Sequence, residues 1–217
     1  MTKRFLNIAN LIISKIEGGY YSPERHYSAA MGRSGETMFG IDRKWGGSIN
    51  TTAAGQKFWS IIDKYSASWP HYYKGGSHEN ELKRLAAEMM YSIFQRHFKK
   101  YLSPKAQKLV MKSDRIIAHF YYACWNGEGR FKEFAEDFNK QVEKTTNIAT
   151  LEKSCITARK NHSIQLIRVG GDKMERLIFP ELSPRKKVGK IFLFTILIGG
   201  AGFGGYKLYN YLQTKKE

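Results

Sequence analysis

One stretch near the C-terminus carries no charged residue over 16 positions, from Ile191 to Tyr206. As an α-helix it spans roughly 24 Å at about 1.5 Å per residue, slightly less than the hydrocarbon thickness of a bilayer. Its glycines weaken a helix in water but let helices approach closely in lipid, and Gly200-x-x-x-Gly204 offers a small-residue packing face. We therefore expect a single-pass transmembrane anchor over residues 191–212, with self-association through Gly200 and Gly204 as an option.

This anchor divides the 217 residues into a domain at 1–182, a basic linker at 183–190 and the membrane segment. A domain of that length can bury a proper core. The formal net charge is +17; residues 183–217 hold seven Lys/Arg and one Glu, or +6, which leaves +11 on the domain. Such a basic surface suits an anionic polymer, whether nucleic acid, acidic lipid or bacterial envelope. The basic residues are scattered and no nucleic-acid-reading motif is present, so nucleic acid is the least favoured of these partners.

Apolar residues recur at helical spacing through most of the domain, which predicts a mainly α fold. The first helix is expected over residues 5–16, and a central, strongly apolar helix from Ser103-Pro104 to Trp125. Residues 18–50 are rich in glycine and follow no sustained period, so they predict a small irregular or partly β lobe. Gly170-Gly171 is expected to interrupt the helices before a last short one.

The cysteines and the N-terminus carry weaker signals. Cys124 and Cys155 are too few for a disulfide framework, so we expect two buried thiols, with a bridge as the less favoured alternative. No cluster has metal-ligand spacing and no phosphate-binding motif is present, so neither a metal nor a cofactor is expected. The N-terminal apolar run superficially suggests a signal peptide, but Asn7 and Asn10 interrupt it, and we expect a structural helix.

Glu17 stands where that first helix gives way to Gly18 and Gly19. A carboxylate gains nothing from the negative end of the helix dipole, and burial against Tyr20 and Tyr21 would also raise its pKa. A carboxylic acid that stays protonated near neutral pH can protonate the leaving oxygen of a glycosidic bond. The alternative is a solvated surface glutamate with no catalytic role.

The segment Glu17-Gly18-Gly19-Tyr20 is followed by a glycine-rich loop and then by Thr37-Met38-Phe39-Gly40-Ile41. In this order the two motifs resemble the start of the small phage-type muramidases of glycoside hydrolase family 108, with a weaker echo at Trp125-Asn126-Gly127. The resemblance is most specific over the first third of the chain. It implies a lysozyme-like fold, peptidoglycan as the substrate and Glu17 as the general acid.

The same resemblance implies the remaining site residues. Thr37 would orient the attacking water, and Asp42 or Glu36 would reach the far side of the sugar ring. Tyr20, Trp45, Trp125 and Asn126 are the expected substrate-binding residues: Trp45 either stacks on a sugar or fills the small lobe, and Asn126 either bonds the glycan or caps a helix.

One departure from the family pattern keeps other mechanisms open. Small phage lysozymes often have an aspartate between the glutamate and the threonine, whereas residues 18–36 contain none. A lytic transglycosylase, which needs a single acid/base, is therefore a second enzyme hypothesis. A muramidase-like protein that only binds glycan and a basic, membrane-anchored structural protein of a virion are the non-enzyme hypotheses.

The numbers of basic residues on the two sides of the expected anchor are nearly equal, so they hardly distinguish the two membrane orientations. Four basic residues lie from Arg185 to Lys190 and three follow Tyr206, a slight excess that places the domain on the cytoplasmic side. Peptidoglycan does not lie there. The conflict resolves if the anchor sits in a virion membrane, or in the host inner membrane with insertion only at infection or lysis.

Overall fold

The computed structural model describes residues 1–20, 27–28, 33–34, 36–44, 46–69, 73–162 and 165–182. Met1–Leu182 forms one compact unit, distinct from Ser183–Glu217. Among the described helices, none combines the length and the apolar character needed to cross a bilayer. The predicted linker at 183–190 and anchor at 191–212 lie outside the described residues.

The described chain is mainly helical, as predicted. The principal helices are α1 Lys3–Lys15, α2 Ala53–Tyr65, α3 Glu79–Tyr101, α4 Pro104–Val110, α5 Asp114–Ala123, α6 Glu128–Lys144, α7 Ile148–Lys160, α8 Gln165–Lys173 and α9 Phe179–Leu182. Short 3-10 turns are η1 Gly47–Ile49, η2 Ser66–Ser68, η3 Gly76–His78 and η4 Cys124–Asn126, and the π-helical segment η5 is Met174–Ile178. Two antiparallel hairpins pair β1 Tyr27–Ser28 with β2 Arg33–Ser34, and β3 Thr37–Met38 with β4 Ile41–Asp42.

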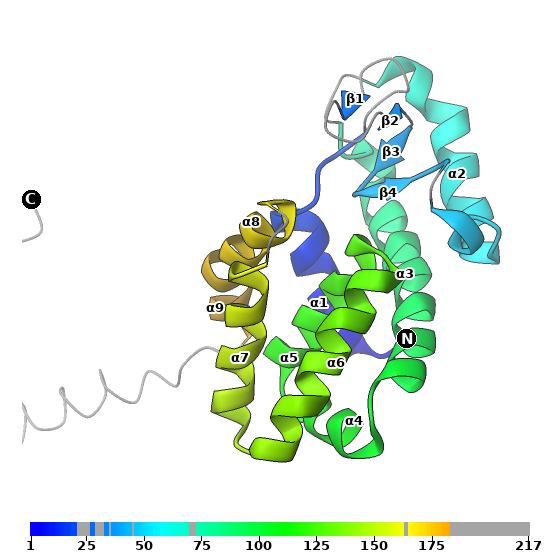
Figure 1. Cartoon of the computed structure of the whole chain (residues 1–217). Helices are drawn as coiled ribbons and strands as arrows, with labels where there is room; N and C mark the ends of the chain where they lie inside the picture. The colour runs from blue at the N-terminus through cyan, green and yellow to red at the C-terminus, as the bar shows by residue number, and fades with distance from the viewer. Residues whose placement is uncertain are drawn as a thin grey trace, which may run out of the picture. The chain divides into compact units, whose positions relative to one another are not determined.

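Figure 1 shows how α3 joins two groups of elements within Met1–Leu182. The hairpins and α2 lie at the end where α3 begins, whereas α4 lies at its other end. The 23 residues of α3 extend about 35 Å at 1.5 Å per residue, enough to pass from one group to the other. Helix α5 lies in the larger group, in contact with α1, α3, α6 and α7.

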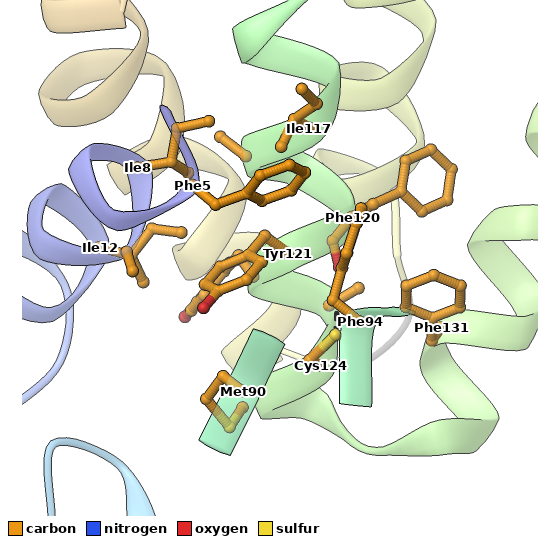
Figure 2. Packing of buried hydrophobic residues seen from close by; sticks show 14 of the residues in the cluster. Phe5, Ile8, Ile12, Met90, Phe94, Ile117, Phe120, Tyr121, Cys124 and Phe131 are labelled. Atoms are coloured by element: carbon orange, nitrogen blue, oxygen red, sulfur yellow. Dashed lines mark hydrogen bonds between the residues drawn. The ribbon is translucent and has the colours of Figure 1, made fainter. Parts of the chain in front are cut away.

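Helix α5 is the centre of the core, as its apolar sequence predicts. Every residue from Ile116 to Ala123 is buried. The ring of Phe5 on α1 lies 5.2 Å from Phe94 on α3 and 6.2 Å from Tyr121 on α5 (Figure 2). The buried Tyr121 hydroxyl donates to the Ala87 carbonyl oxygen at 2.6 Å, so its polar end is satisfied. Because each such aromatic side chain contributes about 1.5–3 kcal/mol by burial, α1 is held firmly in place.

The expected single helix from 104 to 125 is wrong. Its predicted start is confirmed, because the Ser103 Oγ accepts from the Ala106 N–H. Helix α4 nevertheless ends at Val110, and Ser113 adopts an extended conformation and caps a new helix through the Ile116 N–H at 3.2 Å. The Ser113 hydroxyl also donates to Glu152 at 2.6 Å, so a contact with α7 fixes this break.

The expected interruption at Gly170-Gly171 is also wrong, because α8 runs through both glycines and continues into η5. A Cβ at Gly170 would lie 2.8 Å from Cε1 of Tyr122, and one at Gly171 would lie 3.1 Å from Cγ of Arg159. The pair therefore permits close helix packing, which offsets its low helix propensity.

Both cysteines are free, buried thiols, as expected. Burial raises the pKa of Cys155 to about 12 and that of Cys124 further still. Neither thiol is therefore an activated nucleophile.

Candidate active site

Glu17 follows the end of α1. The last helical residue is Lys15, and the Glu17 N–H still donates to the Ile12 carbonyl oxygen at 3.2 Å before the chain turns away. Ile12 and Ile13 are fully buried in the core. The position of the Glu17 backbone is therefore set by a packed helix rather than by a loop.

The tip of the β3–β4 hairpin lies directly against the Glu17 carboxyl group. Phe39 and Gly40 form the two-residue turn with φ of 52° and 71°, the left-handed pair typical of tight hairpins. A Cβ added at Gly40 would lie 2.1 Å from Oε2 of Glu17 and 3.0 Å from Cδ1 of Trp125. The backbone conformation therefore favours glycine at position 40, and a larger residue there would also displace the Glu17 carboxyl group.

Trp125 fastens this hairpin to the helical core. Its indole Nε1–H donates to the Phe39 carbonyl oxygen at 2.9 Å. Its ring also lies 5.6 Å from Tyr121 and 6.5 Å from Tyr122. Glu17 and Trp125, 108 residues apart in the sequence, therefore both lie against the tip of the β3–β4 hairpin.

Burial controls the titration of Glu17. The partly buried carboxyl accepts no hydrogen bond from the described residues, and desolvation raises its pKa from 4.5 to about 7. The charge of Lys173 on α8 opposes this increase, and the charge of Glu17 in turn helps to raise the pKa of Tyr122 on α5. Near neutral pH the carboxyl group is thus poised between its protonated and ionised forms, as a proton donor must be.

Thr37 and Asp42 lie at the base of the same hairpin. They are directly opposite each other in the β3–β4 pairing, so their side chains share one face, while Met38 and Ile41 share the other. Thr37 is 7% exposed, and the Asp42 carbonyl oxygen accepts from the Gly46 N–H at 2.7 Å. No carboxylate among the described residues contributes to the raised pKa of Glu17.

Glu36 and Tyr20 belong to a polar cluster beside the hairpin. Glu36 accepts a hydrogen bond from the Tyr20 hydroxyl at 2.7 Å and pairs with Arg43 at 2.8 Å. Arg43 also donates to Asp63 at 2.7 Å. The Tyr20 ring is buried, 5.5 Å from Trp69, so the structure places this residue in the wall of the small lobe.

Arg159 is one of the residues of this region that the sequence analysis did not select. Its guanidinium donates to Oδ1 of Asn126 at 2.8 Å and to the His119 carbonyl oxygen at 3.2 Å, and it lies over the ring of Tyr122 at 4.9 Å. It is fully buried, and desolvation lowers its pKa to about 10. The sequence feature that could have identified Arg159 is its position four residues after Cys155, within the apolar stripe of α7.

Asn126 lies at the predicted corner, the last residue of η4 before Gly127, whose φ is 89°. Its side-chain oxygen accepts from Arg159 and does not cap a described helix. Tyr122 and Lys173, which interact electrostatically with Glu17, were not predicted as site residues either. They come from α5 and α8, far from Glu17 along the chain.

Trp45 and Tyr21 lie outside the described residues. Within the described part of the chain, cavities of about 750 Å³ beside α1 and 490 Å³ between α6 and α7 do not include Glu17 in their walls. The described residues also contain no group of His, Cys, Asp or Glu side chains that could hold a metal ion.

No protein-family model matches this sequence, and neither a curated protein nor a solved structure shows significant similarity to it.

Proposed function

We propose that this chain is a lysozyme-like, membrane-anchored glycosidase that cleaves peptidoglycan with Glu17 as the general acid. One observation carries the proposal: the Glu17 carboxyl, whose pKa burial raises to about 7, lies against the tip of the β3–β4 hairpin at Gly40. The resemblance of the two N-terminal motifs to family 108 muramidases supplies the substrate class. The basic domain suits the anionic bacterial envelope.

In the proposed reaction, protonated Glu17 donates its proton to the glycosidic oxygen as the bond to the ring carbon breaks. Positive charge then develops on that carbon and must be met from the opposite face. Asp42 and Glu36 are the two candidate carboxylates for this role; Glu36 also accepts from Tyr20 and pairs with Arg43. Thr37 shares the face of Asp42 and would orient the water that completes hydrolysis.

A lytic transglycosylase is the second candidate. It is favoured by the sequence between Glu17 and Thr37, which contains no aspartate. In that mechanism Glu17 alone would serve first as the acid and then as the base, and a hydroxyl of the sugar itself would attack the ring carbon.

The expected anchor at 191–212 would tether the domain to a membrane. Because peptidoglycan lies outside the cytoplasm, this membrane would be that of a virion, or the host inner membrane at the time of entry or lysis. Self-association through Gly200 and Gly204 belongs to the same proposal.

The experiment is to incubate the full chain, in a non-ionic detergent, with purified murein and to weigh the released fragments. Hydrolysis adds one water to each cleaved bond, whereas transglycosylation leaves an anhydro product of unchanged total mass. E17Q should abolish release, while the control E143Q, which alters a 70% exposed carboxylate, should not. If the unmodified chain releases nothing from pH 4 to pH 8 but sediments with murein, a glycan-binding protein replaces the enzyme proposal.

A further inference from the structure

The cavity of about 490 Å³ between α6 and α7 lies apart from the candidate active site. Its lining residues come from α5, α6 and α7, three helices that pack against one another (Figure 1). The buried part of the lining consists of His119, Phe134, Phe138 and Cys155, each at most 5% exposed. The volume falls within the range of small-molecule sites, about 300–1,000 Å³. A ligand held here would be additional to the proposed glycan substrate.

His119 brings an unsatisfied polar group to this cavity. The residue is 1% exposed, and its Nδ1 has no hydrogen-bond partner among the described residues. Most buried polar atoms in proteins have a partner, because an unpaired one has lost its bonds to water without replacement. The His119 carbonyl oxygen, by contrast, accepts from Arg159 at 3.2 Å. The unpaired ring nitrogen is therefore the group that a ligand in the cavity would satisfy.

The charges around the cavity favour an uncharged ligand. Burial and the charge of Arg159 lower the pKa of His119 well below 6.5, and burial raises the pKa of the Cys155 thiol to about 12, so both are neutral near pH 7. Asp137 and Lys153, which also line the cavity, are exposed and opposite in charge. An ionised ligand would lose its hydration without gaining a buried counter-charge from the lining.

The walls and the hydrogen-bonding chemistry of His119 narrow the class of ligand further. Phe134 and Phe138 supply aromatic surface, and the His119 ring lies 4.9 Å from Phe134 at an interplanar angle of 77°. A planar ring packs well against such surfaces. A neutral imidazole has one donor and one acceptor nitrogen, whereas a hydroxyl both donates and accepts, so a hydroxyl satisfies Nδ1 in either tautomer. Water would also satisfy this nitrogen but would leave the phenylalanine rings hydrated.

We propose that this cavity binds a small, uncharged aromatic alcohol of the phenol class, with its ring against Phe134 and Phe138 and its hydroxyl hydrogen-bonded to Nδ1 of His119. The ring removes the apolar walls from water, and the hydroxyl supplies the missing partner of His119. Because the lining includes none of the candidate catalytic residues, this inference does not depend on the cleavage of peptidoglycan.

The test compares 4-fluorophenol with fluorobenzene, two probes that differ by one hydroxyl group and are followed by fluorine NMR. Each is titrated into the full chain in a non-ionic detergent, and the same titration without protein measures its uptake by the detergent. We expect a Kd for 4-fluorophenol of about 1 mM or less, an affinity within reach of a ligand of this size. Fluorobenzene should bind roughly fivefold more weakly, because it leaves Nδ1 unpaired.

Three variants locate the site. H119F keeps a buried aromatic ring but removes the unpaired nitrogen, so it should bind the two probes with equal affinity. A158L fills the cavity from α7 and should weaken the binding of both probes at least about tenfold. A149L makes the same change at an exposed alanine of α7 outside the lining and should weaken neither. Thermal unfolding followed by circular dichroism checks that each variant folds.

Each outcome decides the inference. Equal affinity of the unmodified chain for the two probes would refute the role of His119, and unchanged binding to A158L would refute this location. No protein-dependent signal from either probe would mean that the cavity holds water only, which overturns the inference. If H119F does not fold, the ratio of the two affinities in the unmodified chain and the comparison of A158L with A149L still give the answer.

Discussion

The E17Q substitution is expected to stabilise the fold above pH 7 and to change its stability little near pH 4. Burial raises the pKa of Glu17 from 4.5 to about 7, so the folded state prefers the protonated carboxyl. Below pH 4.5 both states hold the proton and the preference has no effect on stability. Between pH 4.5 and 7 the unfolded chain loses its proton first, and the free energy of unfolding therefore falls as the pH rises.

The size of this effect follows from the two pKa values. Each pH unit between them is worth about 1.4 kcal/mol, so ionisation of Glu17 costs the fold about 3 kcal/mol above pH 7. A glutamine at position 17 stays neutral at every pH, so the E17Q variant does not lose this free energy of unfolding. For a domain of this size the difference corresponds to a rise in Tm of about 6–12 °C at pH 8.

Thermal unfolding of the full chain in a non-ionic detergent, followed by circular dichroism from pH 4 to pH 8, measures this difference directly. The control E143Q, at a 70% exposed carboxylate, should show no such dependence on pH. A Tm difference between E17Q and the unmodified chain that is the same at pH 4 and pH 8 would refute the argument that burial controls this carboxyl.

Two further predictions concern the hairpin and the pH dependence of the reaction. G40A should destabilise the fold by about 1–2 kcal/mol and abolish murein cleavage, because alanine is strained at a φ of 71° and its Cβ would displace Glu17. The control G129A, in α6, meets nothing within 4 Å; it should keep murein cleavage and, because alanine favours a helix, should not destabilise the fold. Denaturant unfolding and fragment release test this pair, and normal activity of G40A would contradict it. Murein cleavage by the unmodified chain should decline above pH 7 as Glu17 loses its proton, and initial rates that stay level to pH 9 would exclude this group as the acid.

The parts of the fold that could be predicted depend on local chemistry. The apolar stripe of α1, the serine cap before α4 and the buried character of α5 are all written within a few neighbouring residues. The break before α5 was missed because its cause is the contact of Ser113 with Glu152, 39 residues away. The glycine pair in α8 was misread because its role is to admit Tyr122 and Arg159 from other helices.

The candidate site shows the same contrast between residues that the local sequence identifies and residues whose roles depend on distant contacts. Glu17 and Trp125 could be selected from the sequence because each lies within two residues of a glycine where a helix was expected to end. Tyr122, Lys173 and Arg159 could not, since their roles arise only when α5, α7 and α8 meet near the end of α1. A single charged residue in an apolar stripe, as at Arg159, is the pattern that points to such a buried polar contact.

The bond from the Trp125 indole to the Phe39 carbonyl has a consequence for the acid itself. The hairpin tip lies against the Glu17 carboxyl, and this bond holds the tip in place. If the bond were lost and the tip moved away, water would reach the carboxyl and its pKa would fall toward 4.5. The protonation of Glu17 and the position of the hairpin are therefore linked, so that a change in one shifts the other.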